Sequence, residues 1–293
     1  MIEVGVVLLN HKGSHYLEDL YLNISEKIGM EFGKWLFLIV DNSLDEKESI
    51  FIRNFACKRS NIEIIFSEEN KGYAHGNNLG LRYLSENGIK YGMIVNPDII
   101  FLTQDFISHF INLIKTNKAI SIIGPKLLDP IGNEITIITK MNFINAVIDY
   151  NPSFVESKPK DVYATMGCCL FLDVFRLKEI NFLDEGTFLY REEQILAEKL
   201  IVNKMLWYIL PVVEVVHNHS RKLQSPSKLL RHKLYEYEST KLYFVKYLNY
   251  SGLYVFAYLI LFLFKTFLYY NYVIIIYSIN AIKKKYLDHR SIQ

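Results

Sequence analysis

The sequence predicts an α/β protein, with helices on both faces of a mainly parallel sheet, followed by a carboxy-terminal helical region. Short apolar runs alternate with segments of helical spacing through the first half of the chain, a pattern typical of parallel sheets. From residue 227 onward the chain changes to long helical stretches rich in Tyr, Phe and basic residues. Hydrophobic residues make up 51% of the 293 residues, enough for one large or two modest folded domains.

The predicted strands of the first half are EVGVVLL, KWLFLIVD, NIEIIFS, YGMIVNPD and AISIIGP. Apolar residues at helical spacing predict helices between them, over residues 17–28, 46–55, 73–87 and 104–116. Residues 132–161 are irregular and rich in Asn and Pro, and we expect loops and short strands there. A strand (ATMGCCLFLDV), a helix (REEQILAEKLIVNK) and two short strands (KMLWYILPVVEVVHNHS) complete this part.

Cysteine and charge patterns bear on the compartment and on the surfaces that the protein contacts. Three cysteines, two of them adjacent, make no disulfide framework and match no zinc site, which suits a reducing cytosol. The opening MIEVGVVLLN lacks a basic segment and predicts a first strand, not a signal peptide. From position 217 onward there are 12 Lys or Arg against 3 Asp or Glu, and before it 21 against 28. With the apolar content, this distribution favours an anionic membrane surface over nucleic acid.

Acidic side chains follow two of the predicted strands. Pro97 offers no backbone donor to a central ladder, so the fourth strand should stop there and place Asp98 at its carboxyl end. Asp41 ends the second strand in the same way, at the edge where open α/β sheets bind their ligands. An aspartate there can accept a hydrogen bond from a nucleobase or a ribose hydroxyl. Taken alone, a solvated or helix-capping aspartate explains each position as well.

A glycine-rich segment, NKGYAHGNNLG, follows the third strand. Its glycines fit neither the G-x-G-x-x-G nor the P-loop spacing, so neither dinucleotide nor P-loop phosphate binding is indicated. Small residues near a helix start still let backbone donors approach a phosphate or a sugar. An ordinary Gly-Asn helix entry is the alternative explanation.

Five segments in sequence order resemble the inverting family 2 glycosyltransferases with the GT-A fold, and within them the rhamnosyltransferase-like enzymes of bacterial surface polysaccharide biosynthesis. They are VGVVLLNHKG, VDNSLD, NKGYAHGNNLG, IVNPDI, and the block MGCCLFLDVFRLKEINFLDEGTFLYREEQILAEKL with PVVEVVHNHS after it. The resemblance covers about residues 1–246. It implies a GT-A catalytic domain over 1–226, with a nucleotide-sugar-binding half (1–100) and an acceptor-side half (101–226), and a helical membrane-associating region over 227–293.

The resemblance also implies roles for individual residues. Asp98, in the family's variant of the D-x-D motif, and His217 would hold a divalent cation, Mg²⁺ or Mn²⁺, on the donor's phosphates. His219 faces the same way as His217 along the strand, and we favour His217. In the pair Glu192-Glu193, Glu193 would be the general base, one methylene longer than the family's usual Asp. The nucleotide-sugar would be bound by Asn10, Asp41, Lys71, Gly72, Tyr73, Asn78 and Asn96.

Without the resemblance, simpler explanations apply to these residues. Glutamates are favoured in the first turn of a helix by its dipole, so Glu192 and Glu193 alone favour a structural role. A surface histidine is the simpler explanation of His219. Asp184 and Glu185 match an acidic pair before the family's aromatic loop, and we expect them to shape that loop.

The predicted function is the inverting transfer of a sugar to a lipid-linked glycan at the cytoplasmic face of the membrane. Rhamnose from dTDP-rhamnose is the first candidate donor, and a UDP-sugar is the second. A sugar nucleotidyltransferase is the alternative enzyme class, but LLNHKGSHYL contains only Gly13 where that class has a Gly-rich basic loop. A catalytically degenerate GT-A protein, acting as a binding module or membrane scaffold, is the non-enzymatic alternative.

The carboxy-terminal stretch bears on membrane contact. Residues 253–264 and 266–282 supply 12 and 17 mostly apolar residues on either side of Lys265. Each is shorter than the ~20 residues that a spanning helix needs, and lysines flank both ends of the stretch. We therefore expect two helices lying on the inner leaflet, with the protein cytoplasmic and peripheral to the membrane. Packing of these helices on the domain, or on a second subunit in a homodimer, is the alternative.

Overall fold

The computed structural model describes residues 2–31, 33–148, 158–218 and 225–290, with the backbone alone at 147–148 and beyond residue 276. The chain divides into two units, one of residues 1–141 and 150–219 and the other of residues 142–149 and 220–293. The second division falls near the predicted boundary at 226. Residues 142–149, which the sequence analysis assigned to the first unit, group with the carboxy-terminal helices.

The amino-terminal part of the first unit is a parallel sheet in the order β3-β2-β1-β4. Its strands are β1 (Val4–Asn10), β2 (Trp35–Asp41), β3 (Ile62–Phe66) and β4 (Tyr91–Val95). The central strands β1 and β2 are apolar over nearly their whole length because helices cover both of their faces. The predicted strand–helix alternation is confirmed here, and the strands end together at one edge of the sheet.

The sheet continues through strands of mixed direction, so the prediction of a mainly parallel sheet holds for the first half only. β10 (Cys169–Asp173) lies antiparallel between β4 and β6 (Ile120–Leu128), and β11 (Leu206–His217) is parallel to β6. β5 (Ile99–Phe101) and β8 (Lys160–Val162) pair antiparallel with β11. A small separate ladder joins β7 (Ile137–Ile138) to β9 (Ala164–Thr165).

β11 corrects the prediction of two short strands in this stretch. It is one strand whose register against β6 shifts between Leu210 and Glu214, around Pro211. Proline removes a ladder donor, but a bulge absorbs the extra residues and lets the strand continue. The continuation carries the chain to His217, at the same edge of the sheet as the end of β4.

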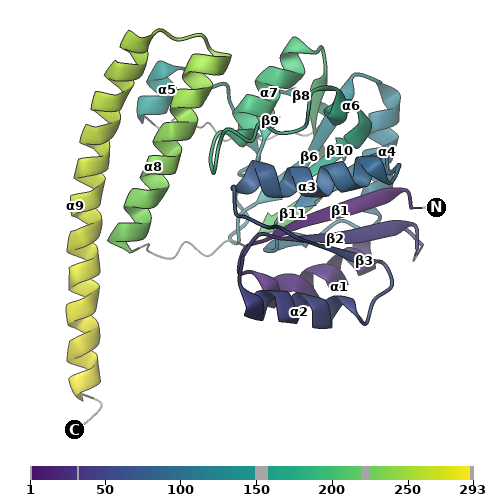
Figure 1. Cartoon of the computed structure of the whole chain (residues 1–293), viewed down its shortest axis with the longest axis horizontal. Helices are drawn as coiled ribbons and strands as arrows, with labels where there is room; N and C mark the ends of the chain where they lie inside the picture. The colour runs from purple at the N-terminus through teal and green to yellow at the C-terminus, as the bar shows by residue number, and fades with distance from the viewer. Residues whose placement is uncertain (1, 32, 149–157, 219–224, 291–293) are drawn as a thin grey trace. The chain divides into compact units, whose positions relative to one another are not determined.

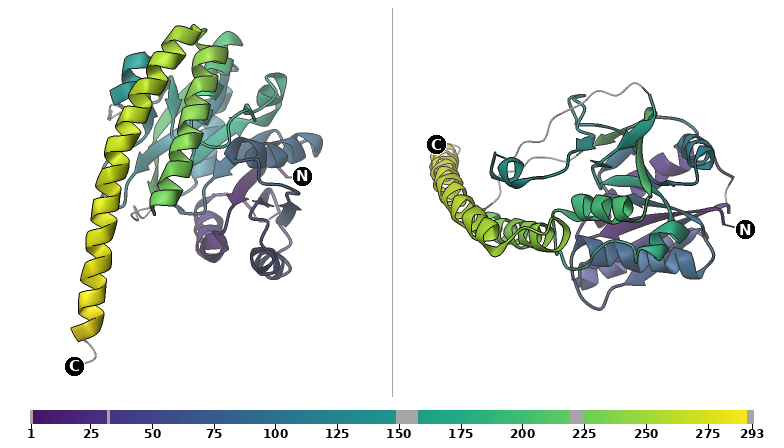
Figure 2. Two further views of the ribbon diagram at one scale, coloured as in Figure 1. Left: turned by 60° about the vertical axis from the view of Figure 1, so that its left-hand side comes forward. Right: turned by 90° about the horizontal axis from the view of Figure 1, so that it is seen from above.

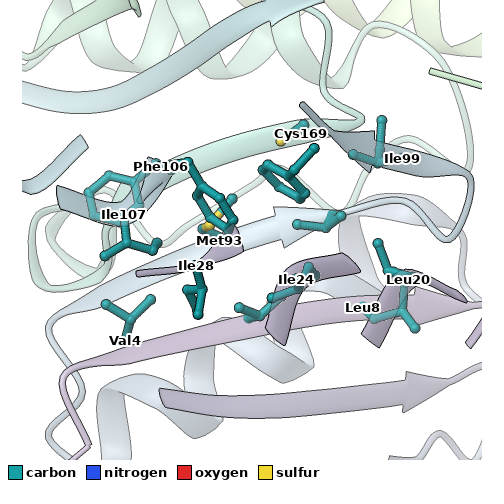
Figure 3. Close-up of a cluster of buried hydrophobic side chains, with 14 of the residues drawn as sticks. Val4, Leu8, Leu20, Ile24, Ile28, Met93, Ile99, Phe106, Ile107 and Cys169 are labelled. Atoms are coloured by element: carbon teal, nitrogen blue, oxygen red, sulfur yellow. The ribbon is translucent and has the colours of Figure 1, made fainter. Parts of the chain in front are cut away.

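Helices cover the two faces of the sheet in separate layers (Figure 1). α1 (Leu17–Lys27), α2 (Glu46–Ala56) and α4 (Phe106–Thr116) share one apolar cluster with β1 and β2, part of which is drawn in Figure 3. α3 (Tyr73–Glu86), α6 (Val174–Glu179) and α7 (Glu192–Val202) pack in the cluster on the opposite face. A single 3₁₀ turn, η1 (Ser14–Tyr16), precedes α1.

Two glycines of NKGYAHGNNLG serve helix–sheet packing. Gly76 and Gly80 lie on the face of α3 that contacts β1, and a Cβ at either position would collide with the side chain of Leu9 or Val7. Their lack of a side chain lets α3 lie close against the sheet. Close packing of α3 brings its first residues, which follow Gly72, to the carboxyl edge of the parallel strands.

The second unit is helical. It contains α5 (Phe143–Ile148), α8 (Pro226–Leu242), a π-helical turn (Tyr243–Tyr247) and α9 (Gly252–Arg290). α9 turns back alongside α8 and extends past the first turn of α8, as Figures 1 and 2 show. Aromatic rings join the two helices: Tyr237 stacks on Tyr258 at 6.2 Å and lies 5.7 Å from the ring of Phe262.

α9 corrects the prediction of two helices separated near Lys265. The structure has one continuous helix of 39 residues. Residues 253–290 contain neither Gly nor Pro, and lysine is a good helix former, so nothing in the local sequence ends the helix at Lys265. Among the described residues, this is the one helix long and apolar enough to cross a membrane: its window Gly252–Ile276 has 25 residues and a mean hydropathy of 1.9.

Candidate active site

The ends of β1 and β2 are tied together by buried polar side chains. The Asn10 amide donates to Asp41 Oδ1 and to Glu48 Oε2, both at 3.0 Å. Asp41 also accepts from the Ser43 backbone N–H and, through Oδ2, from the Ser49 hydroxyl at 3.2 Å. Asn10 and Asp41 are 0% and 2% exposed. They connect the loops after β1 and β2 and form a buried polar layer where these strands end.

The loop before α3 contacts the segment before α7. Gly72 has a φ of 97°, and a Cβ there would collide with the Phe188 carbonyl group. Its N–H donates to Asn70 Oδ1 at 3.0 Å, and the N–H of Tyr73 donates to Phe188 O at 3.0 Å. Glycine is therefore required at position 72 by both conformation and space. Lys71, beside it, is exposed and forms an ion pair with Glu69.

Asn78 occupies a more buried position than the sequence suggested. Its amide nitrogen donates to Leu183 O at 3.0 Å and to Glu185 Oε1 at 2.8 Å, while its Oδ1 accepts from the Leu183 N–H. Asn78 is 1% exposed, so in this conformation it holds the loop after α6. A direct contact between Asn78 and a nucleotide-sugar stays a prediction.

Glu185 anchors the same loop to α3. Burial alone would raise its pKa, but hydrogen bonds from Asn78, His75 and Arg82 outweigh burial and lower the pKa to about 2. The His75 ring nitrogen lies 2.7 Å from Glu185 Oε2, and Arg82 lies 2.9 Å from Oε1. This network agrees with the expectation that the acidic pair shapes the loop.

Asp98 and His217 are brought together by two different parts of the sheet. β4 ends at Val95, and after it the Asn96 N–H donates to Cys168 O at 2.8 Å. His217 faces Ile99 in the β11–β5 ladder, which places its Nε2 3.3 Å from Asp98 Oδ1. Both side chains are 14% exposed. Asn96 is half-buried, and His219 lies outside the described residues.

The pair fits one side of a divalent-cation site. Among the described residues no cluster of three or more His, Cys, Asp or Glu side chains is arranged to hold a metal ion. Asp98 and His217 supply one oxygen and one imidazole nitrogen, a set that suits Mn²⁺ better than the all-oxygen preference of Mg²⁺. Ligand oxygens and waters would have to complete the coordination.

Glu192 and Glu193 begin α7 directly after two residues in the left-handed region, Tyr190 (φ 77°) and Arg191 (φ 69°). Such conformations cost energy in non-glycine residues and persist where the surroundings hold them. Glu193 is half-buried, and its Oε1 accepts from the Gly167 N–H at 3.0 Å. Burial raises its pKa above the usual range.

Glu192 is the more deeply buried of the pair. It is 6% exposed, and its Oε1 has no hydrogen-bond partner among the described residues. Burial, and then the neighbouring charge of Glu193, raise its pKa to about 8. Glu192 is therefore protonated at neutral pH, whereas an exposed glutamate would be ionised.

We expect Glu192→Gln to stabilise the protein at high pH. In the unfolded chain Glu192 loses its proton near its ordinary pKa of about 4.3, and in the folded chain near 8. Between these values the native state binds more protons, so stability falls as pH rises through this window. As pH rises from 5 to 8, the melting temperature of the variant should increase relative to that of the wild type.

Glu198→Gln is the matched control for this measurement, because Glu198 is a buried glutamate of the same helix that pairs with Lys140 at 2.8 Å. Its replacement should not raise the melting temperature relative to the wild type as pH rises. If the difference in melting temperature between the wild type and Glu192→Gln stays constant across pH 5–8, protonation of Glu192 is contradicted.

Cys168 lies between the two acidic parts of the site. Burial and the adjacent Cys169 raise its pKa well above the usual range, and the charges of Glu193 and Asp98 add to the shift. The Cys168 backbone oxygen accepts from the N–H of Asn96, two residues before Asp98, and the neighbouring Gly167 N–H donates to Glu193. The structure thus gathers the Asp98–His217 pair and Glu193 around the Gly167–Cys168 turn.

The sequence analysis missed three residues of this arrangement. Glu48 holds Asn10, Phe188 contacts the backbone at Gly72, and Gly167 contacts Glu193. Gly167 had a signal, since a lone glycine before two cysteines and a strand marks a close backbone approach. Glu48 and Phe188 had none, because their partners are distant in sequence.

Comparison with known proteins gives one relative by sequence. No family model matches the chain. The low-salt glycan biosynthesis hexosyltransferase Agl10 of Haloferax volcanii is 27% identical over 200 residues, which are 65% of this chain and 59% of that protein. The chain thus matches less than two thirds of this relative's length.

Several solved structures have the same architecture. The mannosyltransferase PcManGT from Pyrobaculum calidifontis, in complex with GDP-Man and Mn²⁺, superposes with a TM-score of 0.60 and 13% identity over 85% of this chain and 65% of that chain. Residues 1–349 of S. aureus TarS, in complex with UDP-GlcNAc, superpose with a TM-score of 0.57 and 14% identity, over 83% of this chain and 66% of that chain. GalNAc-T7 with UDP, GalNAc and Mn²⁺ superposes with a TM-score of 0.56 and 12% identity, over 83% of this chain and 50% of that chain. The fold of this chain is the GT-A fold, as predicted.

Proposed function

We propose that the protein is an inverting glycosyltransferase that moves a sugar from a nucleotide-diphosphate donor to a hydroxyl group of a glycan. The observation that carries the proposal is the convergence of Asp98, His217 and Glu193 at the carboxyl edge of β4, β11 and the start of α7 within a GT-A fold. The similarity to a hexosyltransferase of glycan biosynthesis supports it.

The donor's nucleoside belongs at the ends of β1 and β2. Asn10 and Asp41 are held by neighbouring side chains there, which suits them to present a rigid polar floor to a base or ribose. Lys71, Gly72 and Asn96 lie on the loops toward the diphosphate. dTDP-rhamnose remains the first candidate donor by the resemblance above, and UDP-sugars the second. PcManGT binds GDP-Man and TarS binds UDP-GlcNAc, so these two nucleotide-sugars belong in any screen.

Asp98 and His217 are the residues that would hold a divalent cation on the donor's phosphates. When bound, the cation neutralises negative charge on the leaving nucleotide diphosphate. Two of the similar structures contain Mn²⁺, in agreement with the oxygen and nitrogen donors of this pair. His217 reaches Asp98 from a separate strand, and its Nε2 lies 3.3 Å from Asp98 Oδ1.

Glu193 is suited to the base role by its position and its raised pKa. Its carboxylate accepts the proton of the acceptor hydroxyl while the hydroxyl oxygen bonds to the anomeric carbon of the sugar. The bond from that carbon to the phosphate oxygen breaks on the opposite face, and its electron pair leaves with the nucleotide diphosphate. One such displacement inverts the configuration of the sugar. Glu192, buried and protonated, keeps a second negative charge away from Glu193 at neutral pH.

A thermal-shift screen of nucleotide-sugars with and without Mn²⁺ tests the proposal. A ligand that binds only the folded state raises the melting temperature, so the correct donor should do so and should do it better with Mn²⁺. The donor found in this way is then tested for transfer to a glycan acceptor. A nucleotidyltransferase would instead accept a nucleoside triphosphate and a sugar phosphate. Binding of a donor without any transfer would indicate a degenerate GT-A protein.

We also propose that α9 associates with the membrane. Of its apolar window, only 11% is buried within the protein. Its outward side chains are large and apolar, and Phe256, Ile260, Leu263, Phe264 and Phe267 are 53–65% exposed. An apolar face of this length is covered by lipid or by another protein chain.

Lys265 points away from Phe256, Ile260, Leu263 and Phe267 on α9. One helical turn before it, Phe262 is 8% exposed and packs against Tyr237 of α8, and Lys265 itself is half-buried. The single charge within the apolar stretch therefore belongs to the face that packs on α8. This arrangement leaves the outward face free of charge and favours lipid contact along the helix. The inner leaflet of the cytoplasmic membrane, where a lipid-linked glycan acceptor would lie, is the proposed location.

Truncation after about Tyr250 should uncouple membrane contact from donor binding. The truncated chain should bind its nucleotide-sugar, and it should lose activity on a lipid-linked acceptor far more than on a short soluble analogue, because α9 concentrates the enzyme at the acceptor. The full chain should sediment with anionic liposomes, less at high salt but still measurably, since salt does not screen apolar contacts. A full chain that stays in the supernatant at low salt would contradict the proposal, and a dimer in that sample would identify a second copy as the cover of α9.

A further inference from the structure

Gly167 joins two side chains of the candidate site through its backbone. Its carbonyl oxygen accepts a hydrogen bond from the Tyr73 hydroxyl at 2.7 Å, and its N–H donates to Glu193 Oε1 at 3.0 Å. Gly167 lies in the turn between β9 and β10, whereas Tyr73 begins α3 and Glu193 lies in the first turn of α7. One residue of the turn thus connects the starts of the two helices.

A side chain at position 167 would crowd the Glu193 carboxylate and displace it. A Cβ on residue 167 would lie 2.7 Å from Glu193 Oε1 and 3.3 Å from its Cδ. Because position 167 carries no side chain, the carboxylate can lie at hydrogen-bond distance from the backbone N–H without displacement. The glycine is therefore explained by its contact with Glu193.

We propose that Tyr73 is a positioning residue for the general base. Its hydroxyl holds the Gly167 carbonyl, Gly167 in turn holds Oε1 of Glu193, and Oε2 is the oxygen left to receive the acceptor's proton. The inference rests on the proposed function and gives Tyr73 a different role from the donor contact predicted by the sequence analysis.

The electrostatics of the site agree with this role. Burial, followed by the charge of Glu193, raises the pKa of Tyr73 well above its ordinary value, so the hydroxyl keeps its proton and remains a donor. The Gly167 N–H lowers the pKa of Glu193 and partly offsets the effect of burial. Among the described residues, the other titratable or charged groups that act on Glu193 include Glu192 and Arg191 on its own segment and the Cys168 thiol. Loss of the Gly167 contact should therefore raise the pKa of the base.

Tyr73→Phe tests the inference, because it removes only the hydroxyl. We expect kcat to fall about 3- to 10-fold, the size of one neutral hydrogen bond, with the KM for the nucleotide-sugar unchanged. The acidic limb of the pH profile of kcat should move to higher pH, because the carboxylate loses part of its hydrogen bonding. Tyr83→Phe, on the same helix and half-buried, is the matched control and should change neither quantity.

The alternatives give different results. A raised donor KM with an unmoved pH profile would overturn the inference and return Tyr73 to donor binding. Unchanged kcat and an unchanged pH profile would also overturn it, even though Glu193→Gln is inactive. Failure of the proposed function is distinguishable, since then the wild type transfers no sugar or Glu193→Gln transfers as well as the wild type. Gly167→Ala, with its melting temperature recorded, provides a second variant, and it should lower kcat more than Tyr73→Phe.

Discussion

Asp98→Ala is expected to abolish metal-dependent donor binding while the protein remains folded. Asp98 lies between β4 and β5, is outside the two apolar clusters, and has its Oδ1 3.3 Å from His217 Nε2. The backbone oxygen of Asp98, which accepts from the Asn218 N–H at 2.8 Å, is kept by alanine. The variant should therefore melt close to the wild type without ligand and show no additional stabilisation by a nucleotide-sugar when Mn²⁺ is present.

Two further variants sharpen this test. Asp98→Asn retains the shape of the side chain but not its charge, so it separates metal binding from packing. Asp161→Ala removes an exposed aspartate of β8 in the same unit and should leave Mn²⁺-dependent binding intact. His217→Ala should weaken the metal effect less than Asp98→Ala, because an imidazole carries no negative charge to attract the cation. Full Mn²⁺-dependent transfer by Asp98→Ala would remove Asp98 from the metal site.

Glu193→Gln is expected to lower turnover by roughly 10²–10⁴-fold, the loss typical of an acid–base group. Donor affinity should be nearly unchanged, because glutamine has the size of glutamate and its side-chain oxygen can still accept a hydrogen bond from the Gly167 N–H. Measuring donor binding by thermal shift and turnover by product formation separates the two effects.

Glu192→Gln is the internal comparison and should be milder. Glu192 is already protonated at neutral pH, so a neutral amide changes its charge little. If Glu192→Gln lowers turnover more than Glu193→Gln does, Glu192 is the base, and its raised pKa serves proton transfer. Activity of the wild type should rise with pH as Glu193 loses its proton, since burial raises its pKa.

The order of strands and helices was predictable because it depends on local patterns. Apolar runs such as WLFLIVD in β2 and the periodic apolar residues of α1 and α3 appear in the structure within a few residues of their predicted ends. The ends of β1, β2 and β4 were also predictable, since Asn10, Asp41 and the Asn-Pro-Asp segment interrupt apolar runs.

The antiparallel half of the sheet was not predictable in the same way. β10 lies between β4 and β6, and β11 pairs with both β6 and β5, although these strands are far apart along the chain. Strand direction and partner depend on which apolar faces meet in the core, a property of the whole fold. The same holds for α9, where Lys265 was expected to interrupt a helix and instead lies within one continuous helix.

By itself, then, the sequence determined the α/β class, the strand ends that bear Asn10, Asp41 and Asp98, and the apolar carboxy-terminal stretch, because hydrophobic period and chain-breaking residues act within a few positions. Only the tertiary structure decided that His217 reaches Asp98 and that Gly167 lies between Tyr73 and Glu193. These contacts join residues about 26 to 119 positions apart, and they follow from the pairing of β11 with β5 and from the packing of α3 and α7 on one sheet. Burial, which raises the pKa values of Glu192 and Glu193, arises from the same packing and leaves no local mark in the sequence.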